Sequence, residues 1–210
     1  MTAQNEILDA IRRHHLQAVD LPTLDGGWIT YDDPHKQFAK ALEAVKGRCF
    51  RANDLADVNG QIEKLPEYAD SQQICSVIPG VGRSNVDLNA IDDPHDLDNV
   101  DLAVVPGQLA VAENGAVWVT DAGLKHRAIL FVSRQLVLVV PAGELVNNMH
   151  EAYERIADAA QSSFLPVSER RPGFGVFISG PSKTGDIEQI MVIGAHGPRS
   201  LTVFLVDSLK

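Results

Sequence analysis

The stretch QLVLVV, residues 135–140, decides the fold class. Its continuous apolar character is typical of a strand that is buried on both faces of a sheet. Outward from it, short apolar runs alternate with amphipathic helical patterns. Strands are predicted at residues 48–51, 73–78, 102–105, 109–112, 116–120, 175–179 and 201–206, and helices at residues 5–15, 34–45, 55–62 and 144–160. This alternation predicts an α/β fold with a mixed, mostly parallel sheet flanked by helices.

Length and charge narrow the class of protein. The 210 residues are enough for one core and contain no repeat, so we expect a single domain over residues 1–210 with an N-terminal helical segment at about residues 1–47. A formal net charge of −10 argues against nucleic acid as a partner, because binding phosphates requires Lys and Arg. The N-terminus has no apolar signal-peptide core and residues 136–140 are too short to span a bilayer. We therefore expect a cytoplasmic protein without membrane insertion.

Cysteine and histidine usage predicts no metal site. Cys49 and Cys75 fall in separate predicted strands, so they imply neither a disulfide framework nor a thiolate cage. The seven histidines are dispersed without metal-ligand spacing. His126 and Arg127 lie beside an apolar run, where they either add a proton donor and a carboxylate fork to the cleft or belong to a loop or helix start.

The most informative segment is FGVFISGPSKTGDIEQ, residues 174–189. An apolar strand runs into a loop, residues 180–186, after which a helical pattern starts. Backbone N–H groups at a helix N-terminus attract anions, and the loop adds hydroxyls and a charge suited to a carboxylate or phosphate. The alternative is that Thr184 or Asp186 only caps a helix. The candidate ligand-binding residues of this loop are Gly180, Ser182, Lys183, Thr184 and Asp186.

Two further loops carry candidate residues. His196, Gly197 and Arg199 lie just before the last strand, where the guanidinium suits an anion and the imidazole suits proton transfer. Glu113 occupies the turn of the AENGAVWV hairpin. A turn carboxylate is normally just solvated; the functional interpretation makes Glu113 a nucleophile or general base pointing into a cleft. Glu113 and His196 are therefore the candidate catalytic residues.

The C-terminal stretch SGPSKTGDIEQIMVIGAHGPRSLTVFLVD, residues 179–207, resembles the signature of the lactate utilization protein C family, also called the LUD domain. Members typically show a Gly-Pro-Ser, Thr, Asp-Ile-Glu run followed by a Gly, His-Gly-Pro-Arg run. An Ala-Glu-Thr-Gly turn is also typical, and residues 112–115 look like its counterpart. Asn114 and Gly185 depart from the family pattern. The resemblance is strong from about Val100 onward and loose before it.

The resemblance implies a fold similar to the sugar-phosphate isomerase and CoA-transferase superfamily. It also implies a role in oxidising L-lactate to pyruvate beside iron–sulfur partner subunits, with no cofactor in this chain. Such a cluster-free subunit is expected to bind a small carboxylate or another anion. Two alternatives stay open: a free-standing CoA-transferase-like or isomerase-like enzyme that uses Glu113, and a structural adaptor without a ligand site.

Overall fold

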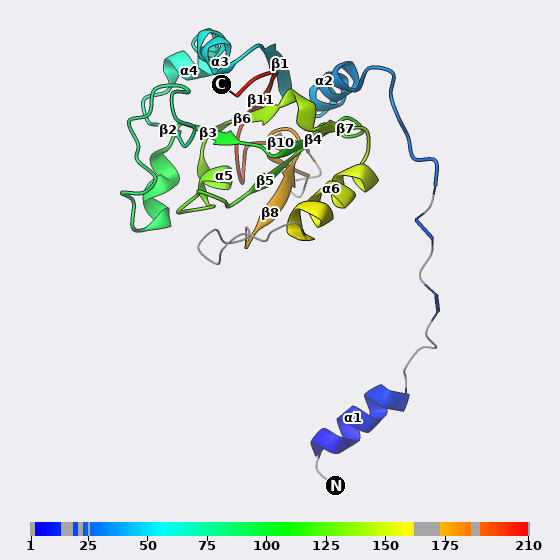
Figure 1. The fold of residues 1–210 in the computed structure, drawn as a ribbon. Helices are drawn as coiled ribbons and strands as arrows, with labels where there is room; N and C mark the ends of the chain where they lie inside the picture. Colours follow the sequence, from blue (N-terminus) through cyan, green and yellow to red (C-terminus); the bar gives the residue numbers. More distant parts are fainter. Residues whose placement is uncertain are drawn as a thin grey trace.

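A five-stranded parallel sheet lies at the centre of the fold (Figure 1). The structure is a computed structural model that describes residues 3–13, 19–20, 23–24, 26–161, 173–185 and 190–209. The strands of this sheet, in spatial order, are β1 (Arg48–Ala52), β11 (Ser200–Val206), β6 (Gln135–Pro141), β3 (Leu102–Pro106) and β2 (Ile74–Ser76). The QLVLVV stretch forms the middle strand, β6, and its five apolar side chains are all buried, as the sequence predicts.

A second, four-stranded sheet packs against the first. Its strands, in order, are β7 (Leu145–Val146), β4 (Leu109–Val111), β5 (Ala116–Thr120) and β8 (Gly175–Ile178). The predicted hairpin around residues 112–115 is present as the antiparallel pair of β4 and β5. It does not add an antiparallel strand to the main sheet, because β4 instead pairs with β7 and β5 with β8. A small third sheet is the hairpin of β9 (Lys183–Thr184) and β10 (Val192–Ile193).

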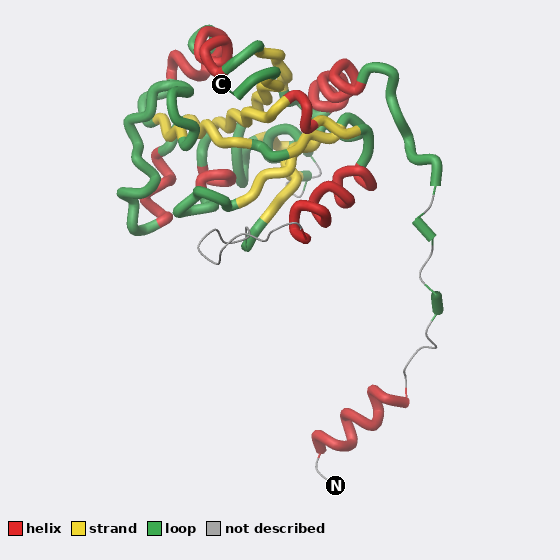
Figure 2. Tube along the Cα trace, in the orientation of Figure 1, coloured by secondary structure: helices red, strands yellow, loops and turns green. Residues whose placement is uncertain are grey.

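Helices flank both sheets (Figure 2). The α-helices are α1 (Ala3–Arg13), α2 (Pro34–Ala44), α3 (Leu55–Ile62), α4 (Pro66–Asp70), α5 (Ile129–Val132) and α6 (Met149–Gln161), and the 3-10 helices are η1 (Pro94–Asn99) and η2 (Ala142–Glu144). Helices α2 and α3 begin at the predicted residues, and the side chains of Asp33 and Asp54 cap them by accepting backbone N–H groups.

Three clusters of buried apolar residues hold these layers together. On one face of the parallel sheet, α3 and α4 pack through residues such as Val58, Ile62 and Tyr68. On the other face, the sheet shares a large core with α2, α5 and the second sheet. The far face of the second sheet packs against α6 around Ala152. The order of layers is therefore helices, parallel sheet, mixed sheet and helix, which confirms the α/β class.

Helix α1 stands apart from these layers (Figure 1). The chain rejoins the body near the start of α6, where the Trp28 ring stacks on His150 with centroids 3.4 Å apart. The Tyr31 backbone N–H donates to the Asn147 side chain at 3.0 Å, and the Asn148 amide donates to the Ile29 carbonyl at 2.9 Å. Residues 28–31 are thus fixed to the body, whereas α1 is not packed on it.

Candidate functional site

The two signature loops come together at the amino ends of β6 and β11. The backbone N–H of Ser182 donates to the Pro198 carbonyl at 2.9 Å, and the N–H of Gly194 donates to the Ser182 carbonyl at 2.8 Å. The N–H of Arg199 donates to the Arg134 carbonyl, one residue before β6, at 2.7 Å. Ser182 is therefore joined to the loop that carries His196, Gly197 and Arg199, as a shared site requires.

The position of this site at the amino edge departs from the usual rule for open α/β sheets. Ligands of such sheets generally bind beyond the carboxyl ends of the strands. The structure has a hollow of about 620 Å³ between α3, α4 and the loop after β2, lined in part by Tyr68, Gly80 and Arg83. The signature loops lie at the opposite edge, because β11 begins directly after Arg199.

Gly180 and Gly197 allow the close approach of neighbouring segments. A Cβ atom on Gly180 would lie 2.5 Å from the carbonyl oxygen of Val45, at the end of α2. A Cβ atom on Gly197 would lie 3.0 Å from the Cβ of Ser182 and 3.5 Å from the carbonyl oxygen of Phe131. Both glycines thus place the loops against the body, whether or not they also contact a ligand.

Three groups suited to an anion have no partner among the residues that the structure describes. Lys183, His196 and Arg199 are exposed, and their side chains form no hydrogen bond or ion pair with any described residue. A chain with a formal charge of −10 thus presents two unpaired cations and an imidazole on adjoining loops. Such groups attract a carboxylate or phosphate from solvent.

The helical pattern predicted after the loop of residues 180–186 begins outside the described residues, and the described part of the loop is partly strand. Lys183 and Thr184 belong to β9 and pair with Ile193 and Val192, and no helix begins within residues 173–185 or 190–209. Asp186, the remaining candidate of this loop, lies outside the described residues. In the described part of the loop, an anion would therefore meet side chains and a short hairpin.

Glu113 occupies the turn between β4 and β5 and contacts the start of α6. Its Oε2 atom accepts the backbone N–H of Met149 at 3.0 Å, and its own N–H donates to the Asn147 carbonyl at 2.9 Å. A carboxylate in this position caps a helix and complements the helix dipole. No hydrogen bond or ion pair among the described residues joins Glu113 to His196. The structure therefore gives Glu113 a structural role.

The turn of Glu113 nonetheless adjoins the first signature loop. The Ser179 hydroxyl, one residue before Gly180, donates to the Asn114 carbonyl at 2.8 Å. The Asn114 side chain in turn accepts the Ala116 N–H at 3.0 Å, which stabilises the turn. Asn114, where the family turn has Thr, thus acts as a turn-forming residue.

His126 and Arg127 lie at a separate hollow of about 380 Å³. A ring nitrogen of His126 lies 2.8 Å from the Ile91 carbonyl, and the Arg127 guanidinium lies 4.9 Å from the centre of the Phe174 ring. These contacts hold the loop before α5, so the loop interpretation of both residues agrees with their geometry.

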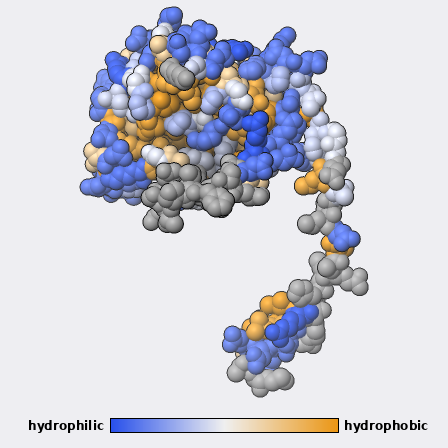
Figure 3. All heavy atoms as spheres, in the orientation of Figure 1, coloured by the Kyte–Doolittle hydropathy of each residue, from blue (hydrophilic) through white to orange (hydrophobic). Residues whose placement is uncertain are grey.

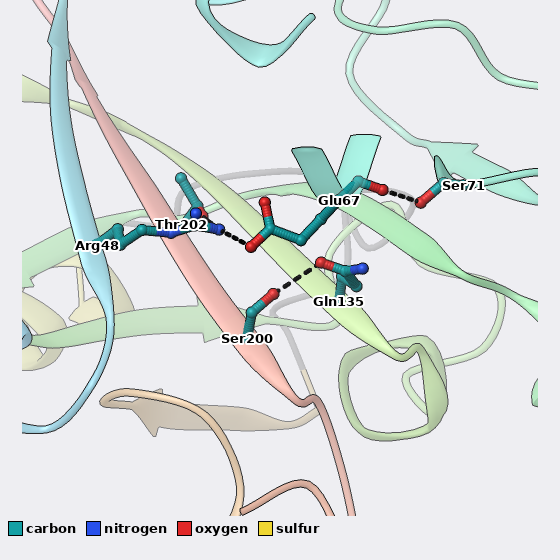
Figure 4. Close-up of polar contacts among 6 residues, drawn as sticks. All are labelled: Arg48, Glu67, Ser71, Gln135, Ser200 and Thr202. Atoms are coloured by element: carbon teal, nitrogen blue, oxygen red, sulfur yellow. Dashed lines mark hydrogen bonds and ion pairs between the residues drawn. The ribbon is translucent and has the colours of Figure 1, made fainter. Parts of the chain in front are cut away.

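The structure adds a polar cluster that the sequence did not indicate (Figure 4). Arg48 Nη2 lies 2.7 Å from Glu67 Oε1 and donates to Thr202 Oγ1 at 3.2 Å, while the Ser200 hydroxyl donates to Gln135 Oε1 at 2.9 Å. The second oxygen of Glu67 is buried and has no hydrogen-bond partner in the described part of the chain. In the sequence, the cluster is indicated only by the positions of Ser200 and Gln135, which directly follow Arg199 and Arg134.

Asp101 stabilises the loop of Arg199 indirectly, through its contact with Arg134. It accepts the backbone N–H groups of Gln72 and Gln73 at 2.9 Å each and pairs with Arg134 at 3.1 Å. The hydrogen bond from Gln73 is the main reason that the pKa of Asp101 is lowered, and the Arg134 charge acts in the same direction. Asp101 thereby fixes Arg134, whose carbonyl holds Arg199.

The two cysteines lie away from these loops, and burial disfavours their reactive thiolate forms. Burial raises the pKa of the Cys49 thiol to about 11 and also raises that of Cys75. The residues that the structure describes include no group of three or more His, Cys, Asp or Glu that could hold a metal ion. None of the helices in the described ranges has the length and apolar character needed to cross a membrane.

Comparisons with known proteins agree with this geometry. The LUD domain family matches residues 92–206, which is more than half of the chain and includes both signature loops. A Bacillus mycoides protein named Lactate utilization protein C 1 is 30% identical over 107 residues, or 51% of this chain and 44% of its own length. The chain thus aligns with less than half of that relative.

Two further comparisons cover more of the chain. A Lactate utilization protein C of Oceanobacillus iheyensis is 26% identical over 98% of this chain and 82% of its own length. A crystal structure of a DUF162 family protein from Deinococcus radiodurans superposes with a TM-score of 0.59 at 19% identity, covering 82% of this chain and 96% of that one. At this identity the likeness shows the fold alone.

Proposed function

The chain belongs to the LUD domain family, and from this premise we propose that it is a cluster-free subunit of a cytoplasmic L-lactate utilization system. In this proposal it binds a small carboxylate while iron–sulfur partner proteins carry the electrons released when L-lactate becomes pyruvate. The names of its relatives in Bacillus mycoides and Oceanobacillus iheyensis support the lactate role. Its two separated cysteines are too few to hold a four-cysteine cluster, which supports assigning the clusters to partners.

One observation carries the ligand part of the proposal. Lys183, His196 and Arg199 come from two hydrogen-bonded loops and are left unpaired among the described residues. The guanidinium of Arg199 suits a carboxylate, Lys183 adds charge, and His196 can donate or accept the proton that accompanies oxidation of a hydroxyl. L-lactate offers both groups, a carboxylate and a neighbouring hydroxyl.

The test restores the gene in a deletion strain and measures L-lactate-dependent dye reduction in lysate. We expect the native chain to restore activity, and His196→Ala and Arg199→Gln to restore about a tenth or less, as for a lost charge-assisted contact of 1.4 kcal/mol or more. Lys40→Gln, which removes an exposed cation on α2, is the matched control and is expected to behave as native. Unchanged activity after deletion would contradict the lactate role.

A direct titration separates ligand binding from assembly. The purified chain is titrated with L-lactate and pyruvate by calorimetry, with Arg199→Gln and Lys40→Gln in parallel. Weaker binding by Arg199→Gln alone supports the site. The adaptor alternative predicts no binding by the native chain together with full activity of the loop variants in lysate.

The alternative of a Glu113 enzyme has less support from the geometry, because that carboxylate caps α6. It predicts that Glu113→Gln abolishes turnover of CoA esters by the purified chain without altering its unfolding. Absence of turnover by the native chain with CoA esters and phosphorylated sugars would remove this alternative.

A further inference from the structure

The hollow between α3, α4 and the loop after β2 has the size and the lining of a small-molecule site. Its volume of about 620 Å³ lies in the range of about 300–1,000 Å³ that is typical of such sites. Asn59, Glu63, Tyr68 and Arg83 contribute polar side chains to its lining, which includes no residue of the signature loops. The surface of the body is mainly hydrophilic in the view of Figure 3. The hollow therefore suits a small polar ligand and is separate from the proposed lactate site.

Asn59 fixes the glycine loop that borders this hollow. Its Nδ2 atom donates to the Gly80 carbonyl and its Oδ1 atom accepts the Gly82 N–H, both at 2.6 Å. The two glycines have φ angles of +76° and +64°, which other residues rarely adopt. A Cβ atom on Gly80 would meet nothing within 4 Å. The loop is thus held in one conformation while the space beside it stays open.

Arg83 is held in place, but its charge is not neutralised. Its Nη2 atom donates to the carbonyls of Tyr68 at 3.3 Å and Ser71 at 3.1 Å, and its guanidinium carbon lies 5.1 Å from the centre of the Tyr68 ring. No carboxylate among the described residues pairs with it, and its Nε and Nη1 atoms have no acceptor there. A guanidinium that is already ordered binds a carboxylate with a smaller loss of conformational freedom.

The Tyr68 hydroxyl adds a second donor beside this guanidinium. Tyr68 is 6% exposed, and its oxygen accepts the backbone N–H of Arg83 at 2.7 Å. The hydroxyl hydrogen has no acceptor among the described residues, and a buried donor without an acceptor is costly. Because the guanidinium lies over the ring of the same tyrosine, one carboxylate can accept hydrogen bonds from both groups.

Glu63 brings the opposite charge to the same hollow. Its side chain is exposed and forms no hydrogen bond or ion pair with any described residue, Arg83 included. Two opposite charges that line one hollow without meeting leave room for a ligand that carries both. A ligand with one charge satisfies only one of them and is repelled by the other, so the pair selects against simple anions and simple cations.

We propose that this hollow binds a free α-amino acid, with the ligand's carboxylate on Arg83 and Tyr68 and its ammonium group on Glu63. The volume leaves room for an amino-acid side chain besides the two charged groups. L-lactate carries a hydroxyl in place of the ammonium group, so it lacks the partner of Glu63. The inference therefore does not depend on the lactate role proposed above, and the two sites are expected to take different ligands.

Nuclear magnetic resonance of the ¹⁵N-labelled full chain tests this proposal. The standard L-amino acids are titrated one at a time, and L-lactate is titrated separately. We expect at least one amino acid to shift the amide signals of Gly80, Gly82 and Arg83, and to leave those of Gly194 and Gly197 in place. L-lactate is expected to do the reverse, which tests the signature loops independently. The proposal is overturned if no standard amino acid shifts the first three signals, or if L-lactate shifts them as strongly.

Analogues that lack one charge show which group recognises which end of the ligand. The tightest-binding amino acid is compared with its hydroxy acid, which has no ammonium group, and with its amide, which has no carboxylate. We expect each analogue to bind about tenfold or more weakly than the amino acid, as for one lost charge-assisted contact. Equal affinity of all three compounds would contradict recognition of both charges.

Substitutions at the two charged residues complete the test. Arg83→Gln and Glu63→Gln should each raise the dissociation constant of the amino acid about tenfold. Glu63→Gln should leave binding of the hydroxy acid no weaker, because that analogue has no ammonium group to lose a partner. Glu63 has no partner among the described residues, so its substitution is expected to preserve the fold. Glu43→Gln and Lys64→Gln remove exposed charges outside the hollow and are the matched controls. An equal loss for every ligand in Glu63→Gln would refute its role.

Discussion

The turn at residues 112–115 and the β9–β10 hairpin both carry candidate functional residues, yet the body holds them very differently. The turn is bonded on several sides: Glu113 to α6, Asn114 to Ser179, and Gly115 packed against α2. The hairpin is exposed, and Lys183 makes no polar contact with a described side chain. A charged residue that already has a structural partner stabilises the fold, whereas an unpaired one remains available to a ligand.

The largest difference in stability is expected between alanine substitutions at Gly115 and at Gly185. Gly115 has φ +66°, and a Cβ there would lie 2.6 Å from the Leu42 nitrogen and 2.8 Å from its Cα. We expect Gly115→Ala to cost about 3 kcal/mol or more, because strain adds to a backbone clash. Gly185→Ala meets nothing within 4 Å and should be nearly neutral. Urea unfolding of both variants measures this, and equal midpoints would refute the contrast.

A smaller effect is expected at Glu113. Glu113→Ala removes the acceptor of the Met149 N–H, so we expect a loss of about 1 kcal/mol in the free energy of unfolding. Glu113→Gln keeps an oxygen at the same place and should lose less. Thermal unfolding of the two variants gives the comparison. A Glu113→Gln chain that unfolds like native but loses all lactate-dependent activity would move this residue from structure to catalysis.

The contribution of Asp101 to the stability of the Arg199 loop can be tested by varying the pH. Its pKa is lowered in the folded protein, so its contribution is present above the unfolded value of about 3.9 and is lost as the pH falls through the folded value. Asp101→Asn should therefore cost about 1 kcal/mol or less at neutral pH, since solvent screens the pair with Arg134. Denaturant midpoints from pH 7 to pH 3 should converge for native and variant; a constant gap would be contrary evidence.

The smallest effects on stability are expected when Lys183 or Arg199 is substituted. Lys183→Gln and Arg199→Gln should each change the free energy of unfolding by less than about 0.5 kcal/mol, because neither exposed side chain has a partner to lose among the described residues. Lactate binding is nevertheless expected to weaken in both. Chemical unfolding checks the prediction for stability, and calorimetry on the same samples checks the prediction for lactate binding. A large loss of stability would show that these residues have a structural role like that of the turn at residues 112–115.

Much of the fold was predictable because its central strands are apolar throughout. The runs that became β3, β6 and β11 are buried on both faces, so no other assignment fitted them. The start of α6 was not predictable: a helix was expected from Glu144, but Leu145 and Val146 pair with β4 as strand β7. Strand pairing over such a distance overrides local helical pattern. The same pairing keeps the hairpin of β4 and β5 out of the main sheet.

The candidate site was predictable to a lesser degree. The sequence and its family resemblance indicated both signature loops, and the hydrogen bonds of Ser182 join them. The strand formed by Lys183 and Thr184 inside the expected loop was missed, because β9 pairs with β10 across residues that no local pattern connects. The partner of Glu113 and the cluster of Arg48 and Glu67 also depend on contacts between distant segments. Sequence thus indicated which loops matter better than what each side chain touches.

Strand β11 lies between β1 and β6, although β1 is synthesised at the start of the body and β11 at its end. While the ribosome is still translating, β1 therefore has no neighbour in the sheet, and one edge of β6 stays open. Open strand edges and contacts of long sequence separation make a nascent chain slow to fold and prone to aggregate. We expect newly made chains to depend on chaperones until Val206 has left the exit tunnel.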